Sequence, residues 1–299
     1  MPEASLRRVC RVLDVTRSTL YGAEAAEVPG NETAAASQAS QDELLVARIK
    51  LLIEEFPTYG YRRIYALLRK RDKLTINRKK VYRLMREQRW MISQRETSPK
   101  PRVQQSRSRT EHSNERWAMD SSHVYGGADG WGHLVAVIDC HDREMVGWEF
   151  ALRGRAQEAE RALEMACLAR FGTLRPTGET PVLRNDNGLV FLSRRFREAC
   201  TFYRLDQQYI TPYTPEQNGL IERFFRSFKE ECVWQQNFTN FEEARRAVRS
   251  WLEWYNSERP HQALRYLSPH EYRAKEPPPA SDPPNQCLRA AEPRLPSVR

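Results

Sequence analysis

The chain has 299 residues and a formal net charge of +9 at pH 7, a size that favours two or more domains and permits a sizeable core. Its best apolar run, LVAVI at 134–138, is far too short to span a membrane, and the first residues, MPEASLRRVC, lack the apolar core of a signal peptide. The six cysteines are scattered and form no Cys-x-x-Cys pair, so they give no support to a zinc site and fit reduced core thiols in a cytosolic protein.

Positive charge is confined to one part of the chain. Residues 48–109 hold 19 Lys/Arg and 5 Asp/Glu, a net charge of +14, whereas the segments on either side are slightly acidic. A basic module of this kind predicts a polyanion as partner, and nucleic acid is the commonest one. The alternative is a basic linker that is merely solvated.

The first 41 residues are predicted to hold two short segments. SLRRVCRVLDVTRSTLY, at 5–21, is typical of a helix, a turn at Asp14–Val15 and a second helix, so residues 1–21 resemble a helix-turn-helix fragment. Residues 22–41 are rich in Gly, Ala, Ser and Glu without periodic pattern, which predicts a linker.

Residues 42–92 are predicted to form a basic helical DNA-binding domain with three helices. The apolar stripe of the first consists of Leu44, Leu45, Ile49, Leu52 and Ile53. PTYGYRRIYALLRKRDK predicts the second, and TINRKKVYRLMREQRW the third, with Asn77 as its N-cap. The candidate DNA-binding side chains are Arg62, Arg63, Arg78, Lys79, Lys80 and Arg83. A solvated cationic face remains the alternative.

The character of the chain changes after a polar, basic linker at 93–112. RWAMDSSHVY and GHLVAVIDCHDREMVGWEF predict three strands with tight turns, and helices and strands then alternate to about residue 273. This order predicts a single α/β catalytic domain over 113–273. The Pro-rich tail at 274–299 is predicted to be disordered.

Three carboxylates stand where separate elements could bring them together. Asp120 ends the apolar start of the first strand, Asp186 ends PVLRN before a sharp Asn-Gly turn, and Glu222 lies on a predicted helix. Phosphoryl transfer by two metal ions needs carboxylates from separate elements, and magnesium prefers oxygen ligands. Asp139 and Asp142 are rival carboxylates, but they fit a hairpin turn better.

The helix that carries Glu222 has two distinct faces. Its apolar stripe consists of Ile221, Phe225, Phe228 and Cys232. Glu222, Arg226 and Lys229 share another face, which would suit a phosphate backbone beside a metal ion. For Asn218, ahead of this helix, a role as a simple N-cap before Gly219 is one interpretation.

The motifs resemble those of bacterial insertion-sequence transposases in the retroviral-integrase superfamily. Asp120, Asp186 and Glu222 match the superfamily's signature, in which 35 residues separate the second Asp from the Glu and a basic residue, here Lys229, follows seven positions later. TPYTPEQNGLIERFFRSFKEE and WYNSERPHQALRYLSP match further blocks. The chain is similar, more narrowly, to the second reading-frame product of elements that make a frameshifted fusion. Asn185, where Ser or Thr is common, and Arg265, where Gly is common, depart from the pattern.

The resemblance implies an RNase H-like (integrase catalytic core) domain behind helix-turn-helix-like elements. It implies cleavage at insertion-sequence ends and transfer of the 3′-hydroxyl into target DNA, with two Mg²⁺ (or Mn²⁺) ions held by the three carboxylates. Arg226 and Lys229 would hold DNA phosphates, and Gln217, Asn218 and Gly219 would form a mobile loop near the cut end. The partners would be terminal inverted repeats, target DNA, further copies of the chain and the first reading-frame product as a fusion. Two alternatives stay open: a nuclease that cuts without joining, and a non-catalytic, element-encoded DNA-binding regulator.

Overall fold

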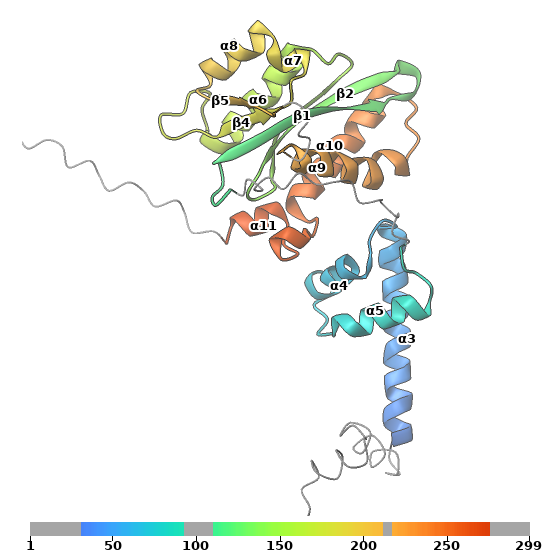
Figure 1. The fold of residues 1–299 in the computed structure, drawn as a ribbon. Helices are drawn as coiled ribbons and strands as arrows, with labels where there is room; N and C mark the ends of the chain where they lie inside the picture. Colours follow the sequence, from blue (N-terminus) through green and yellow to red (C-terminus); the bar gives the residue numbers. More distant parts are fainter. Residues whose placement is uncertain (1–30, 93–109, 212–216, 276–299) are drawn as a thin grey trace, which may run out of the picture. The chain divides into compact units, whose positions relative to one another are not determined.

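The computed structural model describes residues 31–92, 110–211 and 217–275, in two compact units divided between Arg95 and Glu96 (Figure 1). The predicted helix-turn-helix fragment at 1–21 and nearly all of the predicted tail lie outside the described residues. None of the described helices is both long and apolar enough to cross a membrane.

The first unit consists of the three helices that the sequence predicts. They are α3 (Asn31–Glu55), α4 (Tyr61–Lys70) and α5 (Arg78–Glu87). Each contributes one apolar stripe to a common core, with Ile49, Ile64 and Met85 fully buried. Leu44, expected in the first stripe, is 74% exposed, because the buried face of α3 runs through Leu45, Ile49 and Leu52 instead. Asn77 is the predicted N-cap, and its side chain accepts a hydrogen bond of 2.8 Å from the Lys79 backbone N–H.

The structure differs from the predicted linker at 22–41, because α3 already begins at Asn31. The stretch TAAASQASQ at 33–41 is rich in alanine, the strongest helix former, and contains neither Gly nor Pro. Intrinsic propensity therefore extends the helix over a segment that has no apolar period.

The second unit is built on a five-stranded mixed sheet in the order β3-β2-β1-β4-β5. Its strands are β1 (Arg116–Tyr125), β2 (Trp131–Asp139), β3 (Met145–Ala151), β4 (Val182–Asn185) and β5 (Asp206–Tyr209). β1, β2 and β3 pair antiparallel, whereas β4 pairs parallel with both β1 and β5. The central strand, β1, therefore lies where the sheet changes from antiparallel to parallel pairing.

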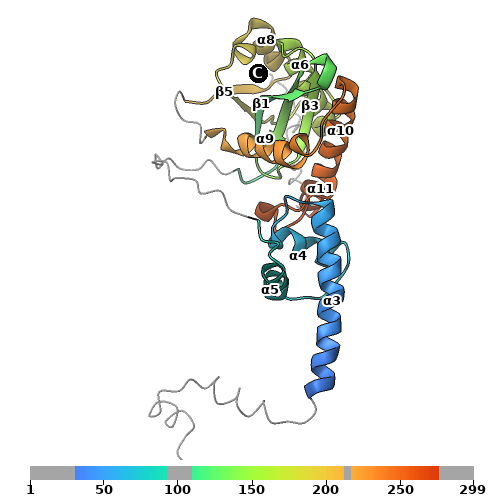
Figure 2. The same cartoon turned by 90° about the vertical axis from the view of Figure 1, so that its right-hand side faces the viewer.

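Helices cover both faces of this sheet (Figure 2). Those of the second unit are α6 (Ala156–Phe171), α7 (Leu189–Leu192), α8 (Arg194–Phe202), α9 (Gly219–Glu231), α10 (Phe241–Ser257) and α11 (Pro269–Arg273). α6 and α8 pack on one face, around Trp117 and Met119, and Gly172 ends α6 in the left-handed conformation, as the sequence predicts. α9 and α10 pack on the other face, around Ala118 and Ala136.

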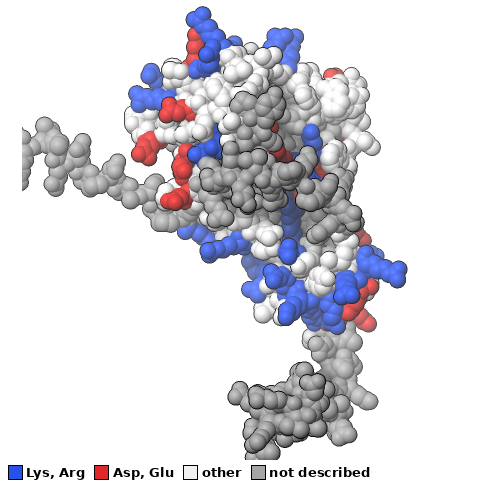
Figure 3. Space-filling view, in the orientation of Figure 1, with Lys and Arg blue, Asp and Glu red and all other residues white. Residues whose placement is uncertain are grey.

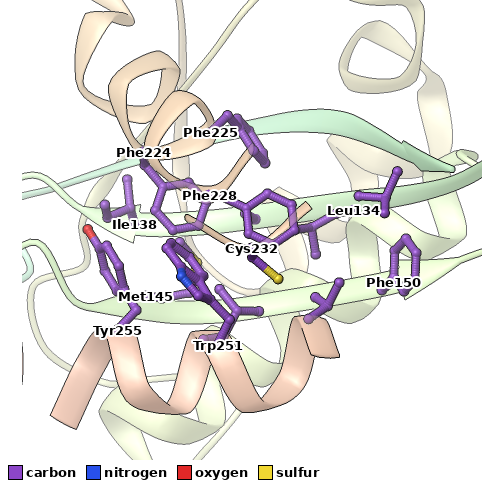
Figure 4. Packing of buried hydrophobic residues seen from close by; sticks show 14 of the residues in the cluster. Leu134, Ile138, Met145, Phe150, Phe224, Phe225, Phe228, Cys232, Trp251 and Tyr255 are labelled. Atoms are coloured by element: carbon purple, nitrogen blue, oxygen red, sulfur yellow. The ribbon is translucent and has the colours of Figure 1, made fainter. Parts of the chain in front are cut away.

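The apolar face of α9 is the one that the sequence predicts. Ile221, Phe225, Phe228 and Cys232 are all buried in the cluster shared with α10. Figure 4 shows the last three of these side chains beside Trp251 of α10. Phe224 is also buried, which the predicted stripe omits, and its ring lies 5.8 Å from that of Trp251. The stripe is therefore wider than predicted, because α9 touches the sheet and α10 at once.

The rival carboxylates Asp139 and Asp142 lie in the predicted turn between β2 and β3. There they surround the fully buried guanidinium of Arg170, whose Nη2 is 2.9 Å from Asp142 and 3.8 Å from Asp139. Glu144 lies 3.1 Å from the same nitrogen. These acids are thus committed to a structural ion cluster that fixes the end of α6 to the turn.

We expect Phe228→Ala to lower the free energy of unfolding by about 3–5 kcal/mol, because its ring is fully buried against Trp251. Arg226→Ala on the same helix removes only an exposed pair with Glu230 and should cost about 0.3–0.5 kcal/mol. Urea unfolding of both variants measures the difference, and equal losses would contradict the assignment of faces.

Candidate active site and nucleic-acid interface

Asp120, on β1, and Asp186, the first residue after β4, lie just beyond the last residue pair of two neighbouring parallel strands. Ala118 of β1 pairs with Arg184 of β4, and each aspartate stands two positions further along its chain. Residues two apart in a strand share a face, so the Asp120 side chain belongs, with Ala118, to the face that α9 and α10 cover. Asp186 begins the sharp turn that the sequence predicts, and its Oδ1 accepts a hydrogen bond of 2.9 Å from the Gly188 backbone N–H.

Glu222, in the first turn of α9, completes the group. Burial is the largest cause that raises the pKa of Asp120, to about 6, while the Ser121 backbone N–H, which donates to the carboxylate at 2.7 Å, opposes the rise. The charges of Asp186 and Glu222 raise this pKa further, and that of Lys229 lowers it. The structure thus brings Asp186, Glu222 and Lys229 within electrostatic range of Asp120.

The donor set fits a hard divalent cation by its chemistry. It consists of three carboxylates from three elements, and the mutual repulsion felt at Asp120 is what a bound cation would relieve. Within the described ranges, however, no three His, Cys, Asp or Glu side chains already stand at metal-ligating distances. The carboxylates are therefore neighbours, not a preformed cage.

The residues around α9 show that two predicted DNA contacts are occupied within the chain. Arg226 pairs with Glu230 at 3.0 Å. The Gln217 amide bonds twice to Thr211: its Oε1 accepts from the Thr211 backbone N–H at 2.9 Å, and its Nε2 donates to the hydroxyl at 3.1 Å. Asn218 is 3% exposed, and its Oδ1 has no partner among the described residues, so it does not cap α9 through its side chain.

Asn185, which departs from the family pattern, lies between Arg184 and Asp186. It is fully buried, and neither polar atom of its side chain has a partner among the described residues. A buried amide without hydrogen-bond partners costs free energy.

Lys and Arg side chains gather over α4 and α5 in the first unit (Figure 3). Arg78 and Lys79 are exposed at the start of α5. Lys80 and Arg83 instead pair with Asp42, at 2.5 and 2.7 Å. Sequence reasoning missed this acid, because it lies on a different helix, 41 residues before Arg83.

Arg62 and Arg63 lie close to aromatic rings at the start of α4. The guanidinium of Arg62 is 5.4 Å from the ring centre of Tyr61, and that of Arg63 is 4.8 Å from the ring centre of Tyr59. These cation–π contacts hold both side chains near one end of the helix.

Known families match both units of the chain. An HTH-like domain model matches residues 40–96, and two integrase core domain models match residues 110–215 and 203–269. The transposase InsD of insertion element IS2A/D/F/H/I/K from Escherichia coli is 30% identical over 242 residues, which cover 79% of this chain and 80% of that protein. The InsD transposase of IS2-9 from strain K12 is equally similar, with 78% of its length covered.

Two solved structures match the chain at low sequence identity. The HTLV-2 integrase catalytic core domain in complex with magnesium is 18% identical, with a TM-score of 0.41, and the match covers 53% of this chain and 95% of that one. A chain of the simian T-cell lymphotropic virus intasome in complex with PP2A regulatory subunit B56 gamma is 18% identical, with a TM-score of 0.44, and the match covers 82% and 80%.

The integrase core places the chain among the polynucleotidyl transferases with an RNase H-like α/β fold. Within that class, the chain belongs to the transposases of insertion elements. The family, fold class and enzyme class that the motifs indicate are thereby confirmed.

The raised pKa of Asp120, which is half-buried, predicts a stability that depends on pH. Its folded pKa of about 6 exceeds the ordinary value of 3.8, so the folded state binds the proton more tightly and loses stability as pH rises between about 4 and 6. We expect Asp120→Asn to melt at a higher temperature than the parent chain at pH of about 7.5, with the gap closing below a pH of about 4. Thermal melting without divalent cations measures the gap, and a gap that is equal at both pH values would contradict the raised pKa.

Proposed function

We propose that this transposase cleaves DNA at the ends of its insertion element and joins the freed 3′-hydroxyl to target DNA, using Asp120, Asp186 and Glu222 as one catalytic and metal-binding set. The observation that carries this proposal is the placement of Asp120 and Asp186 just beyond the paired ends of β1 and β4, on the sheet that α9, which carries Glu222, packs against. The charges of the other two carboxylates raise the pKa of Asp120 beyond the effect of burial, in agreement with this placement. Three acids that repel one another are costly for folding, and a cation-dependent function accounts for them.

The cofactor is proposed to be Mg²⁺ or Mn²⁺, with two ions per site. When bound, such ions activate the attacking oxygen and stabilise the leaving oxygen of a phosphodiester. Asp120 and Asp186 offer their carboxylates from the sheet, and Glu222 offers a third from α9. Lys229 supplies a cation on the same side of α9 for a DNA phosphate.

Residues 42–92 are proposed to form the DNA-binding domain, 93–112 the linker and 113–273 the catalytic domain. Arg78 and Lys79 are the foremost phosphate contacts, because they are exposed and close to the N-terminus of α5. Arg62 and Arg63 would add contacts from α4. Lys80 and Arg83 would reach DNA only by exchanging Asp42 for a phosphate.

The remaining parts of the proposal concern assembly and place. DNA would include the terminal inverted repeats and the target, and several copies of the chain would assemble on it in the bacterial cytoplasm. Fusion to a first reading-frame product is proposed from the family resemblance alone. A joining assay with labelled element ends distinguishes a transposase from a nuclease that cuts without joining and from a regulator that only binds DNA.

Single replacement of Asp120 or Asp186 by Asn, or of Glu222 by Gln, should lower strand cleavage and joining by on the order of 100-fold or more, because each removes a proposed ligand. DNA binding should change little, because the basic side chains of the first unit are retained. Cleavage and joining of labelled ends in Mg²⁺ check this, with gel-shift binding as the control. A variant that cleaves at the parent rate shows that its residue is no ligand.

Arg78→Ala and Lys79→Ala should each weaken DNA binding about equally for all sequences and reduce the slope of log K against log salt by about 1. Unlike these two variants, Lys80→Ala should lower the melting temperature, because it removes one of the two cations that pair with Asp42. Binding titrations over a range of salt concentrations, paired with melting curves, separate the two roles. An unchanged salt slope in both exposed variants would remove α5 from the interface.

A further inference from the structure

Arg184 is a buried cation without an acid. It is 9% exposed on β4, and it makes no ion pair with any carboxylate in the described part of the chain. Its Nε and Nη2 donate to Gln208 Oε1 at 3.3 and 3.0 Å, and its Nη1 donates to the main-chain oxygen of Gln217 at 3.1 Å. Burial, and then the charge of Arg116, lower the pKa of the guanidinium.

Two other buried arginines of the second unit show how such a charge is ordinarily held. Arg170 lies among three carboxylates, and Arg259 forms a two-pronged pair with Glu231 at 2.7 and 2.6 Å. Arg184 has only neutral oxygens as acceptors, which compensate a buried charge less well. Stability alone therefore does not account for an arginine here, since an apolar side chain of similar size would avoid the desolvation cost.

The acceptor at Gln217 lies at the entrance to α9. The next residue, Asn218, uses its main-chain oxygen to accept from the backbone N–H groups of Ile221 and Glu222, at 3.1 and 3.2 Å. Two hydrogen bonds, joined through the Gln217–Asn218 peptide, thus connect the Arg184 guanidinium to the backbone of Glu222. On its own strand, Arg184 stands two residues before Asp186.

Apolar packing does not by itself fix the position of the first turn of α9. The buried stripe of α9 starts at Ile221 and runs toward its C-terminal end, whereas Glu222 itself is exposed. Packing fixes the body of the helix on the sheet, but the helix entrance needs a separate hold. The bonds from Arg184 to Gln217, and from Gln217 to Thr211, supply that hold.

We propose that Arg184 is a positioning residue that sets the first turn of α9 against the end of β4, and so places Glu222 relative to Asp186. This inference rests on the proposed function of the three carboxylates. Arg184 touches neither substrate nor cation. It acts through the Gln217 peptide, and catalytic geometry depends on such supporting groups.

The test compares Arg184→Met and Arg184→Lys with Arg259→Met, which removes a buried guanidinium at the opposite end of α9. Isothermal titration of the full-length chain with Mn²⁺ gives metal affinity, melting gives stability, and hydrogen exchange reports on the Glu222 amide. We expect Arg184→Met to bind Mn²⁺ about 10-fold more weakly, with faster exchange at Glu222 and an unchanged or higher melting temperature. Arg184→Lys should fall between this variant and the parent. Arg259→Met should have a lower melting temperature than the parent but the same affinity for Mn²⁺.

Parent-like Mn²⁺ affinity in Arg184→Met overturns the inference, as does an equal loss in Arg259→Met. Should Arg184→Met fail to fold, Arg184→Lys decides, and parent-like affinity and exchange in that variant also overturn it. Glu222→Gln distinguishes failure of the Arg184 inference from failure of the proposed metal site. If it weakens Mn²⁺ binding while the Arg184 variants do not, only the role of Arg184 fails. If it leaves Mn²⁺ binding unchanged, the proposed metal site fails, and the inference fails with it.

Discussion

The half-buried carboxylate of Asp120, in the central strand of the sheet, is the constraint on which the rest of the second unit depends. β1 has its faces covered by α6 and α8 on one side and by α9 and α10 on the other, so that Asp120 is half-buried. Its pKa of about 6 expresses the cost. Two apolar clusters, one on each face, must offset that cost before the unit can be stable.

The unequal lengths of β1 and β4 explain how such a residue stays reachable. β1 has ten residues and β4 only four, and their pairing ends at Ala118 and Arg184. Beyond that point, β1 continues as a hairpin with β2 and loses its neighbour on the β4 side. Asp120 lies in this stretch, beside the turn that begins with Asp186. A short parallel strand thus opens the sheet where two acids meet.

The second unit contains two opposite arrangements of charged side chains, one around Arg170 and one around Asp120. Around Arg170, every acid has a cation, and Arg273 of α11 also reaches Glu144 at 3.3 Å, so that the turn, α6 and α11 are held together. Around Asp120, the nearby carboxylates of Asp186 and Glu222 repel its charge. The buried side-chain amides of Asn185 and Asn218 have polar atoms without a hydrogen-bond partner in the described part of the chain. The first arrangement stabilises the scaffold, and the second concentrates strain at the proposed site.

Sequence reasoning predicted what depends on local period and missed what depends on distant pairing. Alternation and helical period gave the strands, the face of α9 and the turn at Asp139 and Asp142, because burial acts on each segment directly. The partner of that turn, Arg170, is 28 residues from Asp142, and no local pattern links the two. The same holds for Asp42 with Lys80 and for Phe224, whose burial depends on Trp251 of another helix. The three carboxylates were predicted from their places at strand ends and on a helix, and the family motif agreed, whereas their mutual electrostatics needed the fold.

The three carboxylates differ in how firmly the fold holds them. Asp120 and Asp186 belong to paired strands and their adjoining turn, where hydrogen bonds and both apolar clusters fix the backbone. Glu222 stands in the first turn of α9, ahead of most of the buried stripe, so its backbone depends on a few polar contacts at the helix entrance. Transfer of a phosphoryl group needs reacting oxygens placed within a fraction of an ångström. The third carboxylate is therefore the adjustable member of the set, and the entrance to α9 is where the sequence can tune the site without disturbing either core.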